Sequence, residues 1–279
     1  MTIVDPEAEG RTAAARFRQE HFLGQQPLGD LVALIEQSAG VDVAVLDAEP
    51  DQHGLTMRDP RRDTVIIGVA RTRHPMRQRS TLAHELGHVV FGDWTDNSSC
   101  DWSRRSPAES RADSFARHLL LPLDGLRAFL GEGAGVGLAR LSAVVQRFLV
   151  SPPIAAIALE QAGYIDLDTK SGWMSVTAPQ LAVRFGWSDH YHALETEADQ
   201  RRAPQRLLAR AVRGYAEGVV SAQTIATLRG ITSERAATEL REAGISPGHQ
   251  PVRWSDPDEL PDANVDLAAL DDALGAEER

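Results

Sequence analysis

The stretch that most restricts what this chain can fold into is residues 79–92, RSTLAHELGHVVFG. Apolar residues lie in helical register on both sides of its centre, so the pattern predicts an α-helix. Because residues four apart stand one above the other on a helix, His84 and His88 project side by side and can share one metal ion. Glu85 is rotated by about 100° from His84, where it reaches a water molecule on the ion more easily than the ion itself.

This arrangement is typical of hydrolysis assisted by zinc. The metal lowers the pKa of its water towards about 7, and a carboxylate such as Glu85 takes the proton as general base. A five-residue pattern alone arises by chance in roughly one chain in a hundred of this length. Two ordinary histidines on a half-buried helix are therefore the alternative, and a third ligand is needed to decide.

A second amphipathic helix is predicted over residues 107–122, PAESRADSFARHLLLP, because its apolar residues recur at three- and four-residue spacing. Pro107 suits its first turn, and Pro122 ends it. Glu109 and Asp113 lie four apart on one face. A carboxylate from a neighbouring helix is a suitable third zinc ligand that leaves a fourth position open, and Asp113 can accept a hydrogen bond from a ligand histidine.

Other ligands lie between the two predicted helices. Asp93, Asp96 and Asp101 are rivals to Glu109, although none of them is embedded in a helical pattern. Cys100 is either a redox-sensitive thiol near the metal or a small filler residue, and the filler interpretation is favoured.

Together the two segments resemble a known family. The sequence HELGHVVF, followed 21 residues after His88 by ESRADSFARHLLLP, is similar to the ImmA/IrrE family of bacterial metallopeptidases, a gluzincin-like group with an HExxH and ExxAD pattern. The resemblance covers roughly residues 25–165. It implies that His84, His88 and Glu109 bind the metal, that Glu85 is the general base, and that Asp113 supports a ligand.

The same resemblance implies a function. It indicates a zinc (Zn2+) endopeptidase, with manganese (Mn2+) as the alternative ion, that cleaves a protein partner. The implied partner is a helix-turn-helix transcriptional repressor, in stress response or mobile-element control.

The fold class expected is α+β. Strands predicted at residues 41–46, 54–58 and 64–69 form a small twisted sheet that packs against the motif helix, after helices at 6–23 and 27–39. Residues 1–165 are expected to form a zincin-like metallopeptidase domain. One strand, either 54–58 or 64–69, is expected to pair with an extended substrate.

The rest of the chain is expected to be mainly helical. Helices are predicted at residues 123–130, 138–149, 152–163, 179–186 and 204–218, and residues 166–246 are taken as an accessory region. Residues 221–240 have the outline of a helix-turn-helix, as do residues 141–164 in an alternative interpretation. Glu234 and Glu239 on the second helix disfavour DNA contact, so packing against protein is preferred.

Composition narrows the class of protein. The net charge of −11 disfavours binding to nucleic acid irrespective of its sequence. Residues 247–279 carry nine Asp and Glu against two Arg, so this Pro-containing segment is predicted to be an acidic tail. A solubilising role for the tail is favoured over DNA mimicry or occupation of a basic partner surface. A single cysteine, no signal-like segment and no long apolar run favour a cytoplasmic protein without a membrane partner.

Peptide hydrolysis also needs a donor to the developing oxyanion. Six residues are candidates and the sequence does not rank them: His118, Tyr164, His190, Tyr191, His192 and Tyr215. His118 is half a turn out of register with Glu109 and is expected to face elsewhere.

Two functional hypotheses follow. The first is the metallo-endopeptidase. The second is a non-proteolytic metal-binding regulatory or antitoxin-like module that acts by binding protein or DNA. They differ in whether Glu85 is needed.

Overall fold

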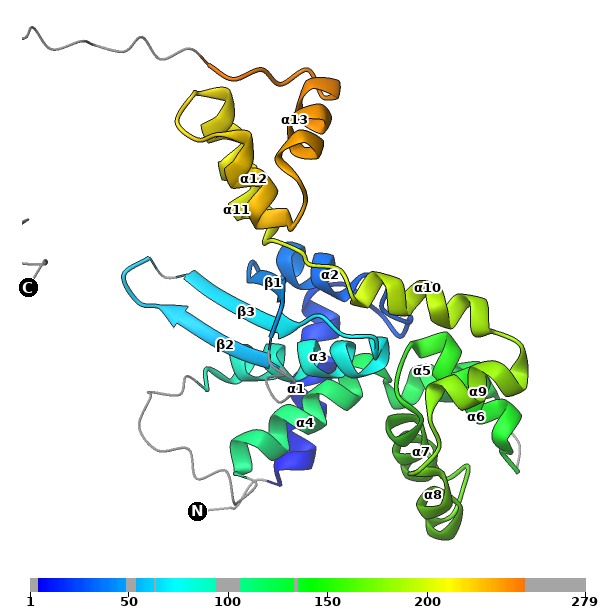
Figure 1. The fold of residues 1–279 in the computed structure, drawn as a ribbon. Helices are drawn as coiled ribbons and strands as arrows, with labels where there is room; N and C mark the ends of the chain where they lie inside the picture. The colour runs from blue at the N-terminus through cyan, green and yellow to red at the C-terminus, as the bar shows by residue number, and fades with distance from the viewer. Residues whose placement is uncertain (1–4, 49–53, 63, 94–105, 133–134, 249–279) are drawn as a thin grey trace, which may run out of the picture.

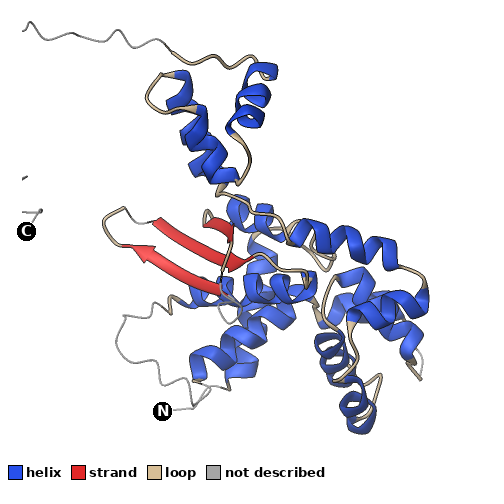
Figure 2. Ribbon diagram, viewed as in Figure 1, coloured by secondary structure: helices blue, strands red, loops and turns tan. Residues whose placement is uncertain are grey.

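The computed structural model describes residues 5–48, 54–62, 64–93, 106–132 and 135–248. It confirms the α+β class, with one three-stranded sheet and a mainly helical C-terminal region (Figures 1 and 2). The elements up to the second motif are α1 (Pro6–Glu20), α2 (Leu31–Ser38), β1 (Asp42–Leu46), β2 (Gly54–Asp59), β3 (Thr64–Ala70), α3 (Pro75–Phe91) and α4 (Pro107–Leu120).

Only helices follow α4 in the described residues. They are α5 (Leu123–Leu130), α6 (Leu138–Phe148), α7 (Pro152–Gln161), α8 (Leu167–Trp173), α9 (Ala178–Phe185), α10 (Ser188–Ala198), α11 (Gln205–Ala216), α12 (Ala222–Arg229) and α13 (Ser233–Glu242). The predicted first helix ends at Glu20 rather than at residue 23. Helices α8 and α10 were not predicted.

The strands lie in the order β1-β3-β2, with β1 parallel and β2 antiparallel to the central β3. Alternate residues point to one face, and on that face Val43, Ile67 and Val69 are buried, while β2 and β3 contact α3. The free side of β1 is taken by an antiparallel bridge between Val45 and Arg202. The outer edge of β2 has no strand partner among the described residues.

Helices α3 and α4 pack closely because α3 has a glycine where they meet. A Cβ at Gly87 would lie 3.2 Å from the Cα of Ala112 and 3.2 Å from the Cδ1 of Phe115. A larger residue at this position would push the two helices apart. The glycine inside the HExxH motif therefore helps to bring the two motif helices together.

Helix α1 lies along α4 (Figure 1) and is tied to it by polar contacts. The hydroxyl of Ser114 donates to the carbonyl oxygen of Glu7 at 2.8 Å, and the buried guanidinium of Arg18 donates to the carbonyl oxygen of Leu119. The N-terminal helix therefore holds the second motif helix at its middle and at its C-terminal end.

The buried hydrophobic residues form two separate clusters. The main cluster runs from α1 to α10 and includes Leu181 of α9 and Tyr191 of α10. The small cluster joins α11, α12 and α13, which stand apart above the sheet in Figure 1. Where the domains divide stays a prediction. The predicted acidic tail at residues 247–279 lies outside the described residues from residue 249 onwards.

No single described helix has both the length and the hydropathy to cross a membrane. Helices α6 and α7 reach the required composition only as a pair bent by 110°, and both contribute to the main hydrophobic cluster.

Candidate metal centre

His84 and His88 on α3 and Glu109 on α4 point to one place. One ligand atom from each residue lies within 4.8 Å of the others. The Nε2 of His84 is 3.1 Å from Oε2 of Glu109, and the Nε2 of His88 is 3.4 Å from Oε1 of the same carboxylate. The two Nε2 atoms are 3.0 Å apart. The three residues that the sequence singled out as ligands are therefore brought together.

Local sequence explains how Glu109 comes to face the histidines. Ser106 caps α4, and its hydroxyl accepts the backbone N–H of Glu109 at 3.2 Å. This cap fixes the first turn of the helix, so Glu109 projects from the end of α4 that lies against α3.

Each histidine also has a carboxylate on the other side of its ring. The Nδ1 of His84 is 2.9 Å from Oδ1 of Asp113, as the spacing of the second motif predicts. Burial acts to lower the pKa of His84, but the hydrogen bond and charge of Asp113, with Glu109 and Glu85 nearby, raise this pKa above its ordinary value. The negative charge that favours a proton on the ring also favours a metal cation beside it.

Asp93 lies behind His88 rather than among the three converging ligands. Its Oδ2 is 3.7 Å from the Nδ1 of His88, on the side of the ring away from Glu109. Asp93 therefore faces the outer nitrogen of His88 as Asp113 faces that of His84, but at a distance too long for a hydrogen bond. Asp96, Asp101 and Cys100, the other residues considered in this segment, lie outside the described residues.

Arg111 of α4 holds Asp93 in place. Its Nε donates to Oδ2 of Asp93 at 3.2 Å, and its NH2 group pairs with the other oxygen. The guanidinium also lies over the ring of Phe91, 4.7 Å from the ring centroid, and pairs with Glu9 of α1 at 3.2 Å. A chain of contacts therefore runs from α1 through Arg111 and Asp93 to His88.

Glu85 is buried between α3 and the sheet. The hydroxyl of Thr56 on β2 donates to Oε2 of Glu85 at 2.6 Å. This bond fixes the orientation of the carboxylate. Sequence reasoning missed Thr56 and Arg111. In the sequence Thr56 lies between the apolar residues Leu55 and Met57, so alternation alone predicts that Thr56 points outwards. Nothing local distinguishes Arg111.

Five of the six oxyanion candidates have other partners or surroundings. His118 contacts Glu7, confirming that it faces away from Glu109, and the hydroxyl of Tyr164 donates to the carbonyl of Gly131. His192 pairs with Glu195. Tyr191 lies in the main core and Tyr215 in the small cluster. The donor to the oxyanion stays unassigned.

The donor set fits a zinc ion. Two imidazole nitrogens and one carboxylate oxygen are the ligands of catalytic sites that keep a fourth position open for water or substrate. Asp113 completes the pattern at His84, because a carboxylate bonded to the outer nitrogen fixes the ring orientation of a ligand histidine. Asp93 adds negative charge behind His88 at 3.7 Å.

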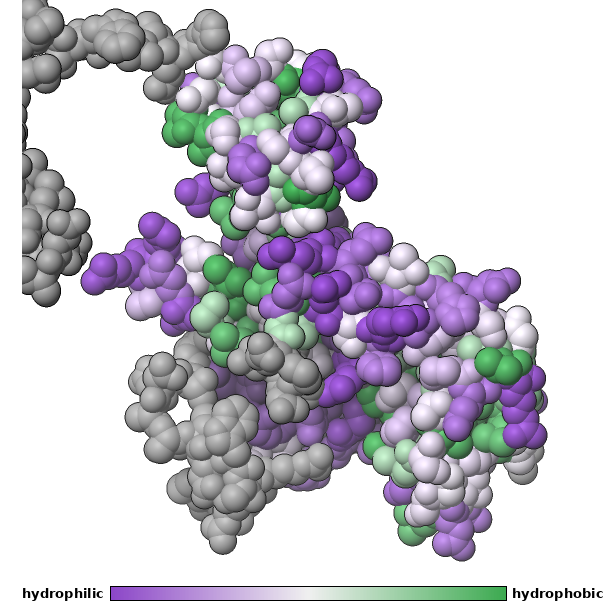
Figure 3. Space-filling model, viewed as in Figure 1, coloured by the Kyte–Doolittle hydropathy of each residue, from purple (hydrophilic) through white to green (hydrophobic). Residues whose placement is uncertain are grey.

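The strand above the site has an apolar outer face. Leu55 and Met57 of β2 are 55% and 50% exposed, and Leu46 of β1 is 44% exposed. Figure 3 shows hydrophobic surface where the sheet lies. The opposite face of β2 carries Thr56, so this strand has Glu85 on one side and an exposed apolar surface on the other.

Comparison with known proteins identifies the region that holds the site. Residues 36–160 match the model of a peptidase family described as the IrrE N-terminal-like domain. Among solved structures, a Mycobacterium tuberculosis transcriptional regulator is similar, with 21% identity and a TM-score of 0.39. That match covers 55% of this chain and 46% of the regulator, less than half of its length. No curated protein matches the sequence.

Proposed function

Residues 36–160 belong to the IrrE N-terminal-like family of peptidases, and on that basis we propose that the chain is a zinc-dependent endopeptidase acting on a specific protein partner. The observation that carries the proposal is the convergence of His84, His88 and Glu109, with Glu85 on the same helix. A structural pair of histidines needs neither the third ligand nor a fixed carboxylate.

His84, His88 and Glu109 would hold the ion. A zinc ion bound there supplies a Lewis acid that polarises a carbonyl and favours ionisation of water. Glu85 takes the proton of the attacking water and delivers it to the leaving amine. The hydroxyl of Thr56, bonded to one carboxylate oxygen, leaves the other oxygen of Glu85 for this proton.

The remaining charged residues position the ligands. Asp113 orients His84 through a hydrogen bond, and Asp93 places a negative charge 3.7 Å from the outer ring nitrogen of His88. Arg111 keeps Asp93 in place, so the ion pair with Glu9 connects helix α1 to the metal centre. Such supporting carboxylates affect metal affinity by about 10–100-fold in known sites.

Strand β2 is the proposed binding edge for the substrate. Its outer edge has no strand partner among the described residues, whereas β3 is central and β1 already bonds to Arg202. An extended peptide that pairs with β2 would obtain main-chain hydrogen bonds and would lie beside Thr56 and Glu85. Of the two strands considered from the sequence, this topology favours residues 54–59.

We propose a helix-turn-helix transcriptional repressor as the substrate, on the strength of the family resemblance. Direct DNA binding by α12 and α13 is not favoured. The two helices do form a helix-turn-helix outline, but Glu239 pairs with Arg229 and with Arg235, which engages two of the cations that phosphate contacts would need.

The test is cleavage of a repressor encoded beside this chain, co-expressed with the wild type or with Glu85→Gln. We expect cleavage with the wild type and its loss by about 100-fold or more in the variant. Zinc content, measured on the purified proteins, should remain in Glu85→Gln and be lost in His84→Ala. If Glu85→Gln keeps the full biological effect on the repressor, the non-proteolytic regulatory module is the correct function instead.

A further inference from the structure

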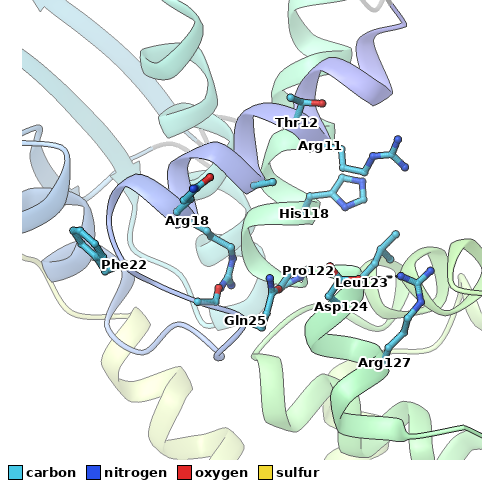
Figure 4. A pocket seen from close by; sticks show the side chains of 13 residues that line it. Arg11, Thr12, Arg18, Phe22, Gln25, His118, Pro122, Leu123, Asp124 and Arg127 are labelled. Atoms are coloured by element: carbon cyan, nitrogen blue, oxygen red, sulfur yellow. Dashed lines mark hydrogen bonds and ion pairs between the residues drawn. The ribbon is translucent and has the colours of Figure 1, made fainter.

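A cavity of about 920 Å³ lies away from the metal centre, at the opposite end of α4. It is formed by α1, the segment that follows it, the end of α4 and the start of α5 (Figure 4). His118 lines it and Glu109 is nine residues earlier on the same helix, which corresponds to about 13 Å along the axis. The peptidase mechanism makes no use of this cavity.

The side chains around the cavity carry an excess of positive charge. Arg11, Arg18 and Arg127 line it, and the single carboxylate in the lining is that of Asp124. Asp124 is bonded to Arg127 three residues further along α5, in an exposed pair. Asp124 offsets the charge of Arg127, and the charges of Arg11 and Arg18 are left in excess.

Arg18 is a buried cation without an anionic partner among the described residues. It is 3% exposed, and its guanidinium donates only to the carbonyl oxygens of Leu119, Gly24 and Gln26. Burial lowers the pKa of Arg18 to about 10, so the group stays charged at neutral pH. Buried charges normally have a counter-charge, and an anion in the cavity would supply one.

Arg11 and Arg127 stand on different sides of the opening, with Leu123 and Asp124 between them in Figure 4. Arg11 has no hydrogen bond or ion pair in the described part of the chain. Its side chain is free to turn towards a ligand, whereas Arg127 would turn towards it from a second direction by exchanging its exposed contact with Asp124. A bound anion would therefore need negative charge in more than one place.

We propose that this cavity binds a small molecule that carries two or more phosphate groups. Guanidinium groups present paired donors that match phosphate oxygens, and Arg is the preferred residue for this recognition. The cavity volume lies within the usual range for small-molecule sites, about 300–1,000 Å³.

Binding would connect the ligand to the metal centre through α4. A polyphosphate between Arg11 and Arg127 would join α1 to α5 across the end of α4. Helix α1 also contacts α4 near the metal through Glu9 and Arg111. Ligand binding would thus stabilise the pair of helices that positions Glu109. The proposal does not depend on peptidase activity.

The test uses the full chain and measures binding of tripolyphosphate, ATP and AMP by calorimetry and by the shift in melting temperature. We expect tripolyphosphate and ATP to bind at least 10-fold more tightly than AMP. Arg11→Gln and Arg127→Gln should each weaken tripolyphosphate binding by about 10-fold, and Arg11→Lys should recover part of the loss. Arg213→Gln, which removes an exposed arginine of α11 far along the chain, is the matched control and should bind as the wild type does.

The two phosphate sources are separated by comparing ligands. Equal affinity for ATP and tripolyphosphate identifies the phosphate chain as the recognised group, and tighter ATP binding identifies a nucleotide. Either result supports the proposal. No binding at millimolar tripolyphosphate, or binding unchanged by both Arg11→Gln and Arg127→Gln, overturns it.

Discussion

The region around α1, α3 and α4 and the unit formed by α11, α12 and α13 are both helical, yet they are held together differently. In the first, side chains more than a hundred residues apart are bonded, as in the contact of Arg18 with the carbonyl of Leu119 and that of Arg111 with Glu9. The second depends on a small apolar cluster and on ion pairs between near neighbours, such as Arg229 with Glu239.

The difference is what a candidate metal centre built from two helices requires. Its ligand residues must stay at fixed distances from one another, so several long-range contacts must hold the two helices together at once. A helical unit with few buried residues can open without the rest of the chain, because local stability follows buried apolar contacts. Its links to the sheet are few, and they include the pairing of Arg206 with Asp42.

The largest effect is expected from a cavity in the small cluster. Ile225 is 2% exposed and is one of four buried residues in that cluster. Ile225→Ala should therefore lower the stability of α11, α12 and α13 by about 2–4 kcal/mol. Hydrogen exchange should show faster exchange in these helices and unchanged protection in α3 and α4, with zinc affinity unaltered.

The control for this variant is Leu119→Ala, which makes a similar cavity in the main cluster. That substitution should speed up hydrogen exchange in α1, α3 and α4 and lower the melting temperature of the region from α1 to α10. If Ile225→Ala also exposes α3 and α4, the two regions unfold together and the comparison fails.

A smaller effect is expected where α1 meets α4. A Cβ on Gly10 would lie 2.6 Å from the Cβ of Ser114 and 2.7 Å from the backbone nitrogen of Phe115. Gly10→Ala should therefore lower the free energy of unfolding by about 1–3 kcal/mol, although alanine favours helix by itself. The effect is measured by chemical denaturation.

Gly172→Ala is the matched control for Gly10→Ala. Gly172 also lies in a helix, α8, but nothing lies within 4 Å of an added Cβ there. This variant should be as stable as the wild type or more stable by about 0.5–1 kcal/mol. Equal effects of the two substitutions would mean that α1 does not press closely on α4.

The sequence predicted which residues share each helix face of the candidate metal centre, because that placement is a local matter. His84 and His88 are one helical turn apart, as are Glu109 and Asp113, and helical periodicity alone puts each pair on one face. The three strands and the helices with an apolar stripe were predictable for the same reason. The family model at residues 36–160 confirms the resemblance that these motifs carry.

Other features depend on long-range folding or lack a pattern. Thr56 reaches Glu85 only because β2 lies over α3, and the place of Asp93 depends on where the chain goes after Gly92. Helix α8 has no buried residue, and α10 buries only Tyr191 and Ala198. Neither helix therefore has the apolar stripe that sequence periodicity detects.

A moderate effect on metal affinity is expected from Asp93→Asn. The variant keeps the shape of the side chain but removes the charge that faces His88, so zinc affinity should fall by about 10–100-fold. Competition with a chromophoric chelator measures this affinity. Asp124→Asn also breaks an ion pair, that with Arg127, and should leave zinc affinity unchanged. Unchanged zinc affinity in Asp93→Asn would mean that the charge of Asp93 does not support His88 as a ligand.

The smallest effect concerns Glu7 of α1, which pairs with Arg117 and His118 on α4 and with Gln161. Partial burial acts to raise the pKa of Glu7, but the hydrogen bond from His118, the charge of Arg117 and the hydrogen bond from Gln161 lower it below the ordinary value of 4.5. The unfolded chain therefore binds a proton at Glu7 more readily than the folded chain.

The contribution of Glu7 should be complete above pH 4.5 and should be lost as the pH falls through its lower, folded-state pKa. At pH 7, Glu7→Gln should lower the free energy of unfolding by about 1 kcal/mol or less, since the carboxylate is partly exposed and screened. Denaturation at several pH values between 7 and 3 should show this difference shrinking on the acid side. Glu20→Gln removes the exposed pair of Glu20 with Arg16 on the same helix and is the control, with a smaller effect. A Glu7→Gln difference that grows as the pH falls would mean that the ties of α1 to α4 do not depend on this charge, and the contrast with α11, α12 and α13 would then rest on packing alone.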